Sequence, residues 1–217
     1  MEDIRWVRPT KQERSQKTLD RFLDAVEALF EEGGIESVSV ADIAKRAGLS
    51  VGAFYARFPN KEAALQAVHE RFCVEGRITA DEALGAERWL CVHAADIVPR
   101  MVAFLVEDYR RRRGLRRVIL ILNGTDEGVR ERSKELSGHV TERLYELFKD
   151  HEDELGHPDL RVAAEVLHRL IFSMLDNAVL FLDGSSTGTP LPTDVFVREL
   201  TALVCGYLRV LPKPDAA

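Results

Sequence analysis

Apolar residues recur at helical spacing along most of this 217-residue chain. The first such stripe repeats every three or four positions, which predicts an amphipathic helix with one face in a core. Its members are Leu19, Phe22, Leu23, Val26 and Phe30. Thr10 followed by Glu13 has the spacing of a capping box, and Gly33 with Gly34 is typical of a helix end. A first helix is therefore predicted from Thr10 to Gly33.

Start and stop signals then follow one another closely. Ser39 can cap a short helix that ends at Gly48, and Ser50 can cap another that Pro59 terminates. The predicted elements are short helices over 40–47 and 50–58, a longer helix over 61–75, and a connection over 76–85.

The rest of the chain predicts longer helices and no sheet, because no segment alternates apolar and polar residues over enough positions. Segment 87–113 is apolar on nearly every side, which is typical of a central helix in a bundle. Pro99 must either kink this helix or start a second one. The other predicted helices cover 115–123, 126–154, 159–182 and 194–211. The predicted fold class is all-α, with a three-helix helix-turn-helix domain over 1–60 and a helical-bundle domain over 61–217.

The composition is that of a soluble globular protein, with 46% hydrophobic and 30% charged residues. No apolar stretch approaches the roughly 18 residues that span a bilayer, and no secretory signal is visible. Three scattered cysteines (Cys73, Cys91 and Cys205) fit reduced thiols and no zinc spacing. We therefore expect a cytoplasmic protein with no cofactor and no membrane partner, and exclude membrane, secreted and metal-finger classes.

The strongest functional signal is the pair of short helices around Ala47-Gly48-Leu49. Ala44 is small enough for the second helix to cross closely, and Gly48 suits the left-handed backbone of the turn. The residues expected to form the small core of this helix-turn-helix are Ile43, Leu49 and Phe54. The helix over 50–58 would then present its first residues to the major groove of DNA.

Charge supports a local nucleic-acid surface on an acidic protein. The whole chain has a net charge of -6, which argues against coating nucleic acid with its entire surface. Segment 41–61 contains four basic residues and one acidic residue, a net charge of +3, which leaves -9 for the remainder. This asymmetry suits one face that meets phosphate. The alternative is a solvated helical pair that packs on the first helix without binding DNA.

At these residues the chain resembles the tetracycline-repressor (TetR) family of bacterial transcription regulators. The resemblance covers residues 10–62 and rests on Ser39, Ile43, Ala44, Ala47, Gly48, Ser50, Gly52, Phe54, Tyr55, Phe58 and Lys61. It implies a homodimeric transcriptional regulator whose two heads bind the two half-sites of a palindromic double-stranded DNA operator. It also implies a repressor that is released when a small-molecule effector binds the body.

The resemblance also implies roles for individual residues. Ser39 would hold a phosphate at a helix N-terminus, Ser50, Gly52 and Tyr55 would contact the DNA backbone, and Lys61 would pair with a phosphate. Base-reading positions are occupied mainly by apolar residues, so Arg57 is expected to supply the main polar contact, to guanine or to phosphate. The candidate DNA-binding residues are Ser39, Lys45, Ser50, Val51, Gly52, Ala53, Tyr55, Arg57 and Lys61. The N-terminal segment contains four basic residues, Arg5, Arg8, Lys11 and Arg14. They could form an arm that contacts the DNA backbone or the minor groove, or belong to an unstructured tail.

A ligand cavity is expected within the apolar central helices. Its candidate walls are Trp89, His93, Ile97, Met101, Phe104, Leu105, Ile119, Phe148, Phe172, Leu175 and Asp176. Plain core packing is the alternative for each. Buried polar members such as His93, Asp96 or Asp176 would need hydrogen-bond partners. Since few charges are expected to point inward, the predicted effector is mainly apolar.

Helices 159–182 and 194–211 resemble the dimerising pair of the family, and two from each subunit would form a four-helix interface. The candidate interface residues are Leu167, Leu170, Ile171, Met174, Ala178, Phe181, Phe196, Leu200, Leu203, Val204 and Tyr207. The alternative is that these residues form the core of a monomer.

Six arginines fall within 110–117, and this cluster admits three interpretations. In the first, they lie solvated at the C-terminal end of a helix, where their positive charges interact favourably with the helix dipole. Additional phosphate contact or coupling to the DNA-binding head is the second possibility, and an acidic effector the third.

An enzyme is not expected. Glu165 and His168 form half of a di-iron carboxylate motif, but no second copy is present, and surface pairing accounts for them. No nucleophile context and no phosphate-binding glycine loop are recognisable. The alternative function is a ligand-independent structural or cell-division factor that binds DNA on the same scaffold.

Overall fold

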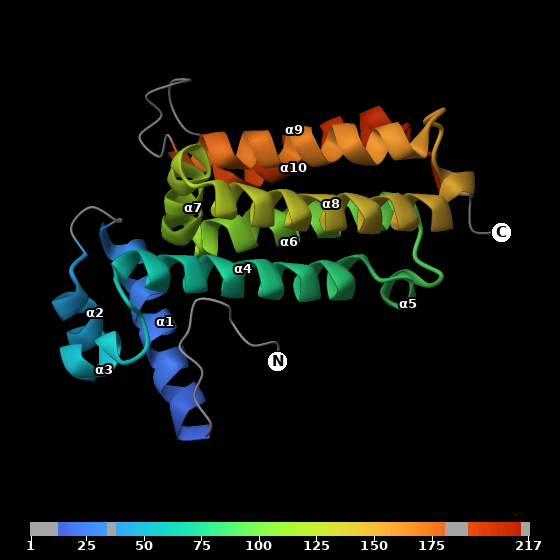
Figure 1. The fold of residues 1–217 in the computed structure, drawn as a ribbon. Coiled ribbons are helices and arrows are strands. Elements are labelled where there is room, and N and C mark those ends of the chain that lie inside the picture. Colours follow the sequence, from blue (N-terminus) through green and yellow to red (C-terminus); the bar gives the residue numbers. More distant parts are fainter. Residues whose placement is uncertain (1–12, 34–37, 181–190, 214–217) are drawn as a thin grey trace. The chain divides into compact units, whose positions relative to one another are not determined.

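The computed structural model describes residues 13–33, 38–180 and 191–213, and these residues are almost entirely helical (Figure 1). The helices are α1 (Glu13–Gly33), α2 (Val40–Ala47), α3 (Val51–Tyr55), α4 (Lys61–Leu84), α5 (Ala86–Trp89), α6 (Ala94–Arg111), α7 (Arg113–Thr125), α8 (Glu127–Asp150), α9 (Leu160–Leu180) and α10 (Thr193–Leu208). A 3-10 turn covers Glu152–Glu154. One isolated antiparallel bridge joins Leu155 to Val210, and the described residues form no strand. The all-α prediction is confirmed.

The chain forms two compact units, and neither is contiguous in sequence. The first unit contains the described residues up to Glu75 together with Arg112–Ser133. The second contains Gly76–Arg111 and the described residues from Lys134 onward. This differs from the sequence-based division into 1–60 and 61–217, because α7 and parts of α4 and α8 belong to the same unit as the short N-terminal helices. Both α4 and α8 run from one unit into the other.

An aromatic cluster holds the N-terminal helices of the first unit together. The rings of Phe22, Phe54 and Phe58 are fully buried. Phe22 meets Phe54 edge-on at 5.5 Å between ring centroids and Phe58 at 6.1 Å. Such edge-to-face pairs add to the free energy of apolar burial. Ile43 is buried as predicted and Leu49 is only half-buried, so the phenylalanines supply most of this core.

The start of α7 is held by a residue of α1. Arg112 precedes α7 and offers it no side-chain cap. Instead, the Glu31 carboxylate accepts the backbone N–H groups of Gly114 at 2.9 Å and of Leu115 at 3.0 Å. A carboxylate at this end also favours the helix dipole. A Cβ atom at Gly114 would lie 2.7 Å from the Glu31 Cα atom and closer still to the Phe30 carbonyl oxygen. Glycine therefore lets the two backbones approach.

The second unit is a helical bundle with its own core. Ala80, Leu84, Trp89, Ile97 and Leu147 form one buried cluster. The Trp89 indole N–H donates to the Ala83 carbonyl at 2.7 Å, which satisfies a buried donor at the end of α4. Elsewhere α10 packs on α6 and α9 through its buried residues Leu200, Val204 and Leu208.

Two predicted boundaries are wrong in detail, and the structure excludes a second helix starting at Pro99. Helix α3 ends at Tyr55, and turns carry the chain on to Phe58. Helix α4 continues through Gly76 to Leu84 where a connection was predicted. Gly76 serves packing, since a Cβ there would lie 3.0 Å from a methyl group of Leu136. Pro99 lies inside α6, which continues through it.

Within the described ranges no helix is long and apolar enough to cross a membrane.

The contact between α1 and α7 gives a first prediction. Substituting Gly114→Ala should lower the free energy of unfolding by about 2 kcal/mol, because the backbone atoms that a Cβ meets cannot turn away as a flexible side chain would. Gly124→Ala in the same helix is the matched control, since a Cβ there meets nothing within 4 Å. The control should be neutral or more stable by up to ~1 kcal/mol. Urea unfolding at one fixed protein concentration measures both, and equal stabilities would contradict the assigned close contact.

Candidate nucleic-acid interface and ligand cavity

Helix α2 begins with a complete capping box. The Ser39 hydroxyl oxygen accepts the Asp42 N–H at 3.2 Å, and the Asp42 carboxylate accepts the Ser39 N–H at 3.0 Å. The Ser39 hydroxyl also donates to this carboxylate. These hydrogen bonds hold the pKa of Asp42 below its ordinary value, because they favour the charged form. The capping box thus sets the start of the helix-turn-helix with side chains three residues apart.

The turn after α2 has the geometry that its glycine predicts. Gly48 has a φ of 63° in the left-handed region. The Leu49 N–H donates to the Ala44 carbonyl at 2.9 Å, and the Gly48 N–H donates to the Lys45 carbonyl at 3.1 Å. Arg21 of α1 also donates to the Gly48 carbonyl at 3.2 Å. The turn is therefore held from within and from α1, which keeps α3 in one orientation on α2.

Helix α3 exposes residues to solvent from its first, Val51, to its last, Tyr55. The Ser50 hydroxyl oxygen accepts the Ala53 N–H at 3.0 Å and caps the helix. Val51 and Tyr55 are 41% and 48% exposed, although both are large apolar or aromatic side chains. A Cβ at Gly52 would have only the Ser50 hydroxyl near it, at 3.8 Å. Helix α3 is thus capped at its start, and its exposed face carries no charged side chain and has space around it.

The predicted DNA-binding residues divide by exposure. Those that lie exposed are Ser39, Lys45, Ser50, Val51, Gly52 and Tyr55. Ala53 and Lys61 are half-buried. The Lys61 ammonium group donates to the Val38 carbonyl at 3.2 Å, so it also connects the start of α4 to the segment before α2. Arg5, Arg8 and Lys11 lie outside the described residues.

Arg57 is the member that the structure does not place on this face. Its side chain is only 9% exposed, and burial lowers the pKa of its guanidinium. The residue follows the end of α3 in a turn whose neighbour Phe58 lies in the aromatic core. The assignment of Arg57 to guanine or phosphate stays a prediction.

Sequence reasoning missed Arg21, which lies on α1 and supports the turn from outside it. Only the contact with the Gly48 carbonyl distinguishes this residue from the other charged residues of an amphipathic helix. It also missed Asn60, whose side-chain oxygen accepts the Ala63 N–H at 2.8 Å and so caps α4.

A buried polar network connects α4 with α7 and α8 inside the first unit. His69 is 1% exposed, and its Nε2 atom lies 3.1 Å from the Ser133 hydroxyl. That hydroxyl donates to Asn123 at 2.9 Å. On the other side of the ring, the Arg132 Nε–H donates to His69 Nδ1 at 3.3 Å. The network therefore joins three helices, with His69 from α4, Asn123 from α7, and Arg132 and Ser133 from α8.

The network determines the protonation of His69. Because Nδ1 accepts a hydrogen bond from Arg132, the ring is neutral, with its proton on Nε2 facing Ser133. Burial and, after it, the charge of Arg132 lower the pKa of His69 to about 4, against the opposing effect of Asp126. A proton on Nδ1 would face a guanidinium N–H in a site from which water is excluded.

Two members of the arginine cluster are structural. Arg112 forms ion pairs with Glu75 at 2.9 Å and with Glu27 at 3.4 Å, and its guanidinium lies 5.2 Å from the centroid of the Phe72 ring. Arg116 lies over the same ring at 5.1 Å. The interpretation as a solvated helix end therefore does not hold for these two. Instead they tie α7 to α4 and α1.

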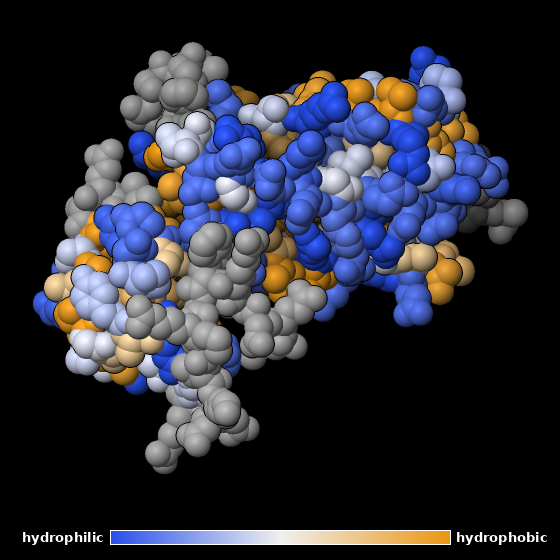
Figure 2. Space-filling model, in the orientation of Figure 1, coloured by the Kyte–Doolittle hydropathy of each residue, from blue (hydrophilic) through white to orange (hydrophobic). Residues whose placement is uncertain are grey.

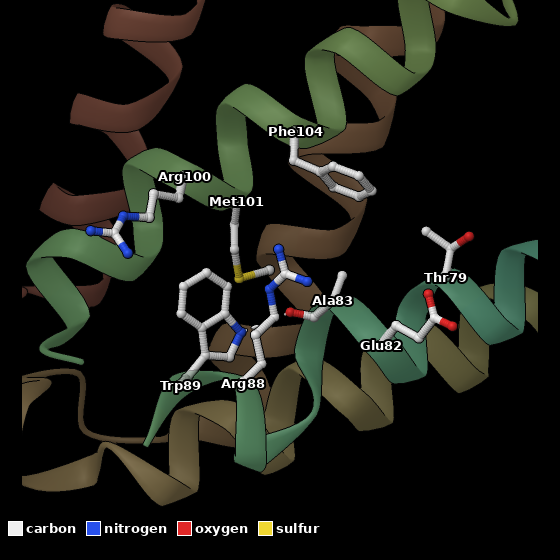
Figure 3. Close-up of a pocket in the computed structure, with 8 residues that line it drawn as sticks. All are labelled: Thr79, Glu82, Ala83, Arg88, Trp89, Arg100, Met101 and Phe104. Carbon is white, nitrogen blue, oxygen red and sulfur yellow. Dashed lines mark hydrogen bonds between the residues drawn. The ribbon is translucent and has the colours of Figure 1, made fainter. Parts of the chain in front are cut away.

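A cavity of about 400 Å³ lies in the second unit between α4, α5 and α6 (Figure 3). It is lined by Thr79, Glu82, Ala83, Arg88, Trp89, Arg100, Met101 and Phe104. Met101 and Phe104 project from α6, whereas Arg88 and Trp89 come from α5. The volume lies within the range of small-molecule sites.

Of the predicted ligand-pocket residues, Trp89, Met101 and Phe104 line this cavity. The residues that do not line it are His93, Ile97, Leu105, Ile119, Phe148, Phe172, Leu175 and Asp176. Ile119 belongs to the other unit, and Ile97 packs in the core behind Trp89.

The polar members of that prediction have partners inside the protein. Asp176 accepts a hydrogen bond from the Tyr109 hydroxyl at 3.1 Å, and His93 Nδ1 accepts the Ala95 N–H at 3.2 Å. Asp96 pairs with Lys213. These groups are therefore accounted for as internal contacts.

The predicted dimer residues separate into a buried and an exposed set. Four of them are buried within the protomer and do not lie on a surface that a partner could contact: Leu167, Ile171, Leu200 and Val204. Leu170, Ala178 and Leu203 are exposed, Met174, Phe196 and Tyr207 are half-buried, and Phe181 lies outside the described residues.

Helix α9 carries an apolar stripe that extends beyond the prediction. Val162, Val166, Leu170, Met174 and Ala178 recur every four residues and are all exposed or half-exposed. Figure 2 shows apolar residues along the edge at which Figure 1 draws this helix. Val162 and Val166 were not among the predicted interface residues, although they fall on the same helical period.

Glu165 and His168 do not face a common centre. Glu165 lies 3.7 Å from the Arg169 guanidinium, and the His168 ring stacks on Phe172 at 4.4 Å. In the described part of the chain, no group of three or more His, Cys, Asp or Glu side chains could hold a metal ion.

Two family models match this chain. The model described as bacterial regulatory proteins of the tetR family matches residues 22–68. The model described as the tetracyclin repressor-like C-terminal domain matches residues 95–208. Together they cover the helix-turn-helix and most of the helices that follow it.

Curated relatives match over less than a third of this chain. The HTH-type transcriptional regulator TtgR of Pseudomonas putida is 40% identical over 68 residues, 30% of this chain and 32% of the relative. AcrR of Shigella flexneri, also an HTH-type transcriptional regulator, is 44% identical over 55 residues, 25% of each chain. The match thus spans about a third or less of these relatives.

Solved structures match over nearly the whole chain. A structure from Mesorhizobium loti, described as a TetR-family transcriptional regulator, has a TM-score of 0.75 at 17% identity and covers 91% of this chain and 98% of its own. NalD of Pseudomonas aeruginosa, described as the secondary repressor of the MexAB-OprM multidrug efflux pump, has a TM-score of 0.62 at 23% identity and covers 89% and 98%. At these identities the likeness concerns the fold.

The buried histidine gives a prediction about pH. The unfolded chain takes up a proton on His69 near pH 6.5, but the folded protein does so only near pH 4, so stability falls as pH falls through this window. Between pH 7 and pH 5 this residue alone should remove about 2 kcal/mol from the free energy of unfolding. In the variant His69→Gln this part of the pH dependence should disappear from urea unfolding curves. A variant that keeps the full loss would assign it to other groups.

Proposed function

Since the chain belongs to the TetR family of bacterial regulatory proteins, we propose that it is a repressor that binds a palindromic DNA operator as a homodimer and is released by a small ligand. The observation that carries the proposal is the open N-terminal face of α3. It is held in one orientation by Ser50, by the Gly48 turn and by the aromatic core. A helix presented in this way can enter the major groove without rearranging the domain.

The contacts available to DNA follow from the exposed groups. Ser39, Ser50 and Tyr55 carry hydroxyl groups, and Lys45 carries a positive charge, all suited to phosphate oxygens. Val51 can contact thymine methyl groups. Such a face combines contacts to the DNA backbone with apolar contacts to the bases. Its preference for a DNA sequence therefore depends on how closely α3 approaches the base edges. Gly52 supports that approach because it adds no side chain to the middle of the face.

The α9 stripe supports the proposed dimer. Apolar residues along one exposed side of a helix face water in a monomer, which is unfavourable in free energy. In an interface between subunits the same residues are removed from water. In a symmetric pair each copy would lay its stripe, together with Leu203 of α10, against the same surface of its partner. Two heads would then address two half-sites of one operator.

Helix α4 would couple the cavity to the helix-turn-helix, because it extends from one to the other. Helix α4 begins at Lys61 beside the helix-turn-helix, and its last turns supply Thr79, Glu82 and Ala83 to the cavity. A ligand that binds more tightly when α4 is displaced shifts the protein away from the DNA-binding arrangement. The buried network around His69 would be remade in such a shift.

A ligand-independent DNA-binding factor on the same scaffold is the alternative. The ligand-released repressor needs a ligand site, and the cavity of about 400 Å³ beside α6 is where such a ligand would bind.

Selection of binding sites from random duplex DNA tests the function. The wild-type protein should select a palindrome, and Gly52→Ala should weaken binding to it at least about tenfold, because a methyl group would then stand between α3 and the DNA. Folding should tolerate this change, since a Cβ meets only the Ser50 hydroxyl. Gly138→Ala in α8 is the matched control, since a Cβ there also has open space, and it should bind normally. Failure of the wild-type protein to select any sequence at low salt would overturn the proposed function.

The dimer prediction concerns α9. The double variant Val166→Asp/Leu170→Asp should sediment with the mass of one protomer where the wild type has twice that mass, because two buried carboxylates per copy would face an apolar partner. It should also lose affinity for a two-half-site duplex. Ile121→Asp, a similarly exposed apolar residue on α7, is the control and should remain dimeric. A double variant that stays dimeric places the interface elsewhere.

A further inference from the structure

We propose that the cavity between α4, α5 and α6 binds an amphipathic monoanion, that is, a carboxylate or similar acid with an apolar body. The proposal deepens the proposed function, because it names the chemical class of the ligand. It departs from the mainly apolar effector that the sequence predicted. The departure rests on Arg88 and Arg100, which were not among the predicted wall residues and which the fold brings to this cavity.

The two guanidinium groups are available to a ligand. Among the described residues, neither Arg88 nor Arg100 forms an ion pair within 4.0 Å of a carboxylate. Arg100 interacts electrostatically with Asp96, but the Asp96 carboxylate is occupied by Lys213 at 2.6 Å. Among the described residues, Glu82 is the single acidic member of the lining. The charged lining therefore sums to one positive charge, which favours a ligand with one negative charge.

Arg88 is placed to receive a carboxylate. Its guanidinium lies 5.4 Å from the centroid of the Trp89 ring. Contact with an aromatic face holds a guanidinium plane and leaves the N–H groups on its edge free to donate. In Figure 3 the Arg88 side chain extends beside the indole toward α6. A planar fork fixed in this way suits bidentate binding of an acid group.

The remaining walls provide for an apolar body. Trp89 offers no donor, because its indole N–H already binds the Ala83 carbonyl. Met101 and Phe104 add a thioether and a ring, and Phe104 is 47% exposed. A ligand that covers this ring removes apolar surface from water. The arginines therefore anchor the polar group, and Trp89, Met101 and Phe104 bind the apolar body.

Trp89 also makes the binding measurable without DNA. The chain contains two tryptophans, so Trp6→Phe leaves Trp89 as the single reporter. The probes are 4-phenylbutyrate, its neutral amide 4-phenylbutanamide and the cationic 4-phenylbutylamine. In this background 4-phenylbutyrate should change the Trp89 fluorescence saturably, and the amide and the amine should each bind at least about ten times more weakly.

Variants assign the preference to the arginines. Arg88→Gln and Arg100→Gln should each weaken binding of 4-phenylbutyrate about tenfold and leave the amide unchanged. Arg100→Gln is the cleaner of the two, because Arg88 also contacts the reporter ring. Arg111→Gln, at the exposed end of the same α6, is the control and should bind as the parent does. Far-ultraviolet circular dichroism confirms that each variant is folded.

Each result has one meaning. Equal binding of acid and amide, tighter binding of the amine, or no saturable change with any probe would overturn the monoanion site. None of these outcomes affects the DNA selection, which tests the proposed function separately. Conversely, a protein that binds 4-phenylbutyrate through the arginines but selects no DNA would keep this site and lose the repressor.

Discussion

The backbone N–H groups at the start of α7 depend on a carboxylate from α1. Glu31 accepts two of them across 83 and 84 positions of the chain, and the absence of a side chain at Gly114 lets the two backbones meet. The first N–H groups of a helix have no acceptor within the helix, so the Glu31 carboxylate stabilises the start of α7 at this contact. Arg112 then reaches Glu27 and Glu75, and the first unit acquires a helix from the middle of the sequence.

The consequence for function is that the chain passes between the two units three times. Helices α4 and α8 each continue from one unit into the other, and α7 of the first unit begins directly after the end of α6. The His69 network joins α4, α7 and α8 within the first unit, and each buried donor in it meets one acceptor. A buried network in which every donor has an acceptor can form in only a few arrangements. A displacement of α4 would therefore break these hydrogen bonds and require another complete set of them.

Local signals in the sequence determined the helix-turn-helix. Ser39 and Ser50 accept N–H groups three residues onward, and Gly48 has the left-handed backbone that its position predicted. These interactions act within a few residues and need no distant partner, so they can be identified from the order of residue types alone. The same holds for the helical character of the chain, because a period of 3.6 residues is visible wherever one face is buried.

Only the tertiary structure decided which helices share a core and which side chains share a site. The sequence could not reveal that Gly76 lies within a helix against Leu136, or that Arg57 is buried. It identified Trp89 by its apolar character but missed Arg88 and Arg100, since an arginine on a helix is ordinarily solvated. These outcomes depend on contacts between residues far apart in the chain. No local pattern contains such contacts, because each one exists only after several helices have packed together.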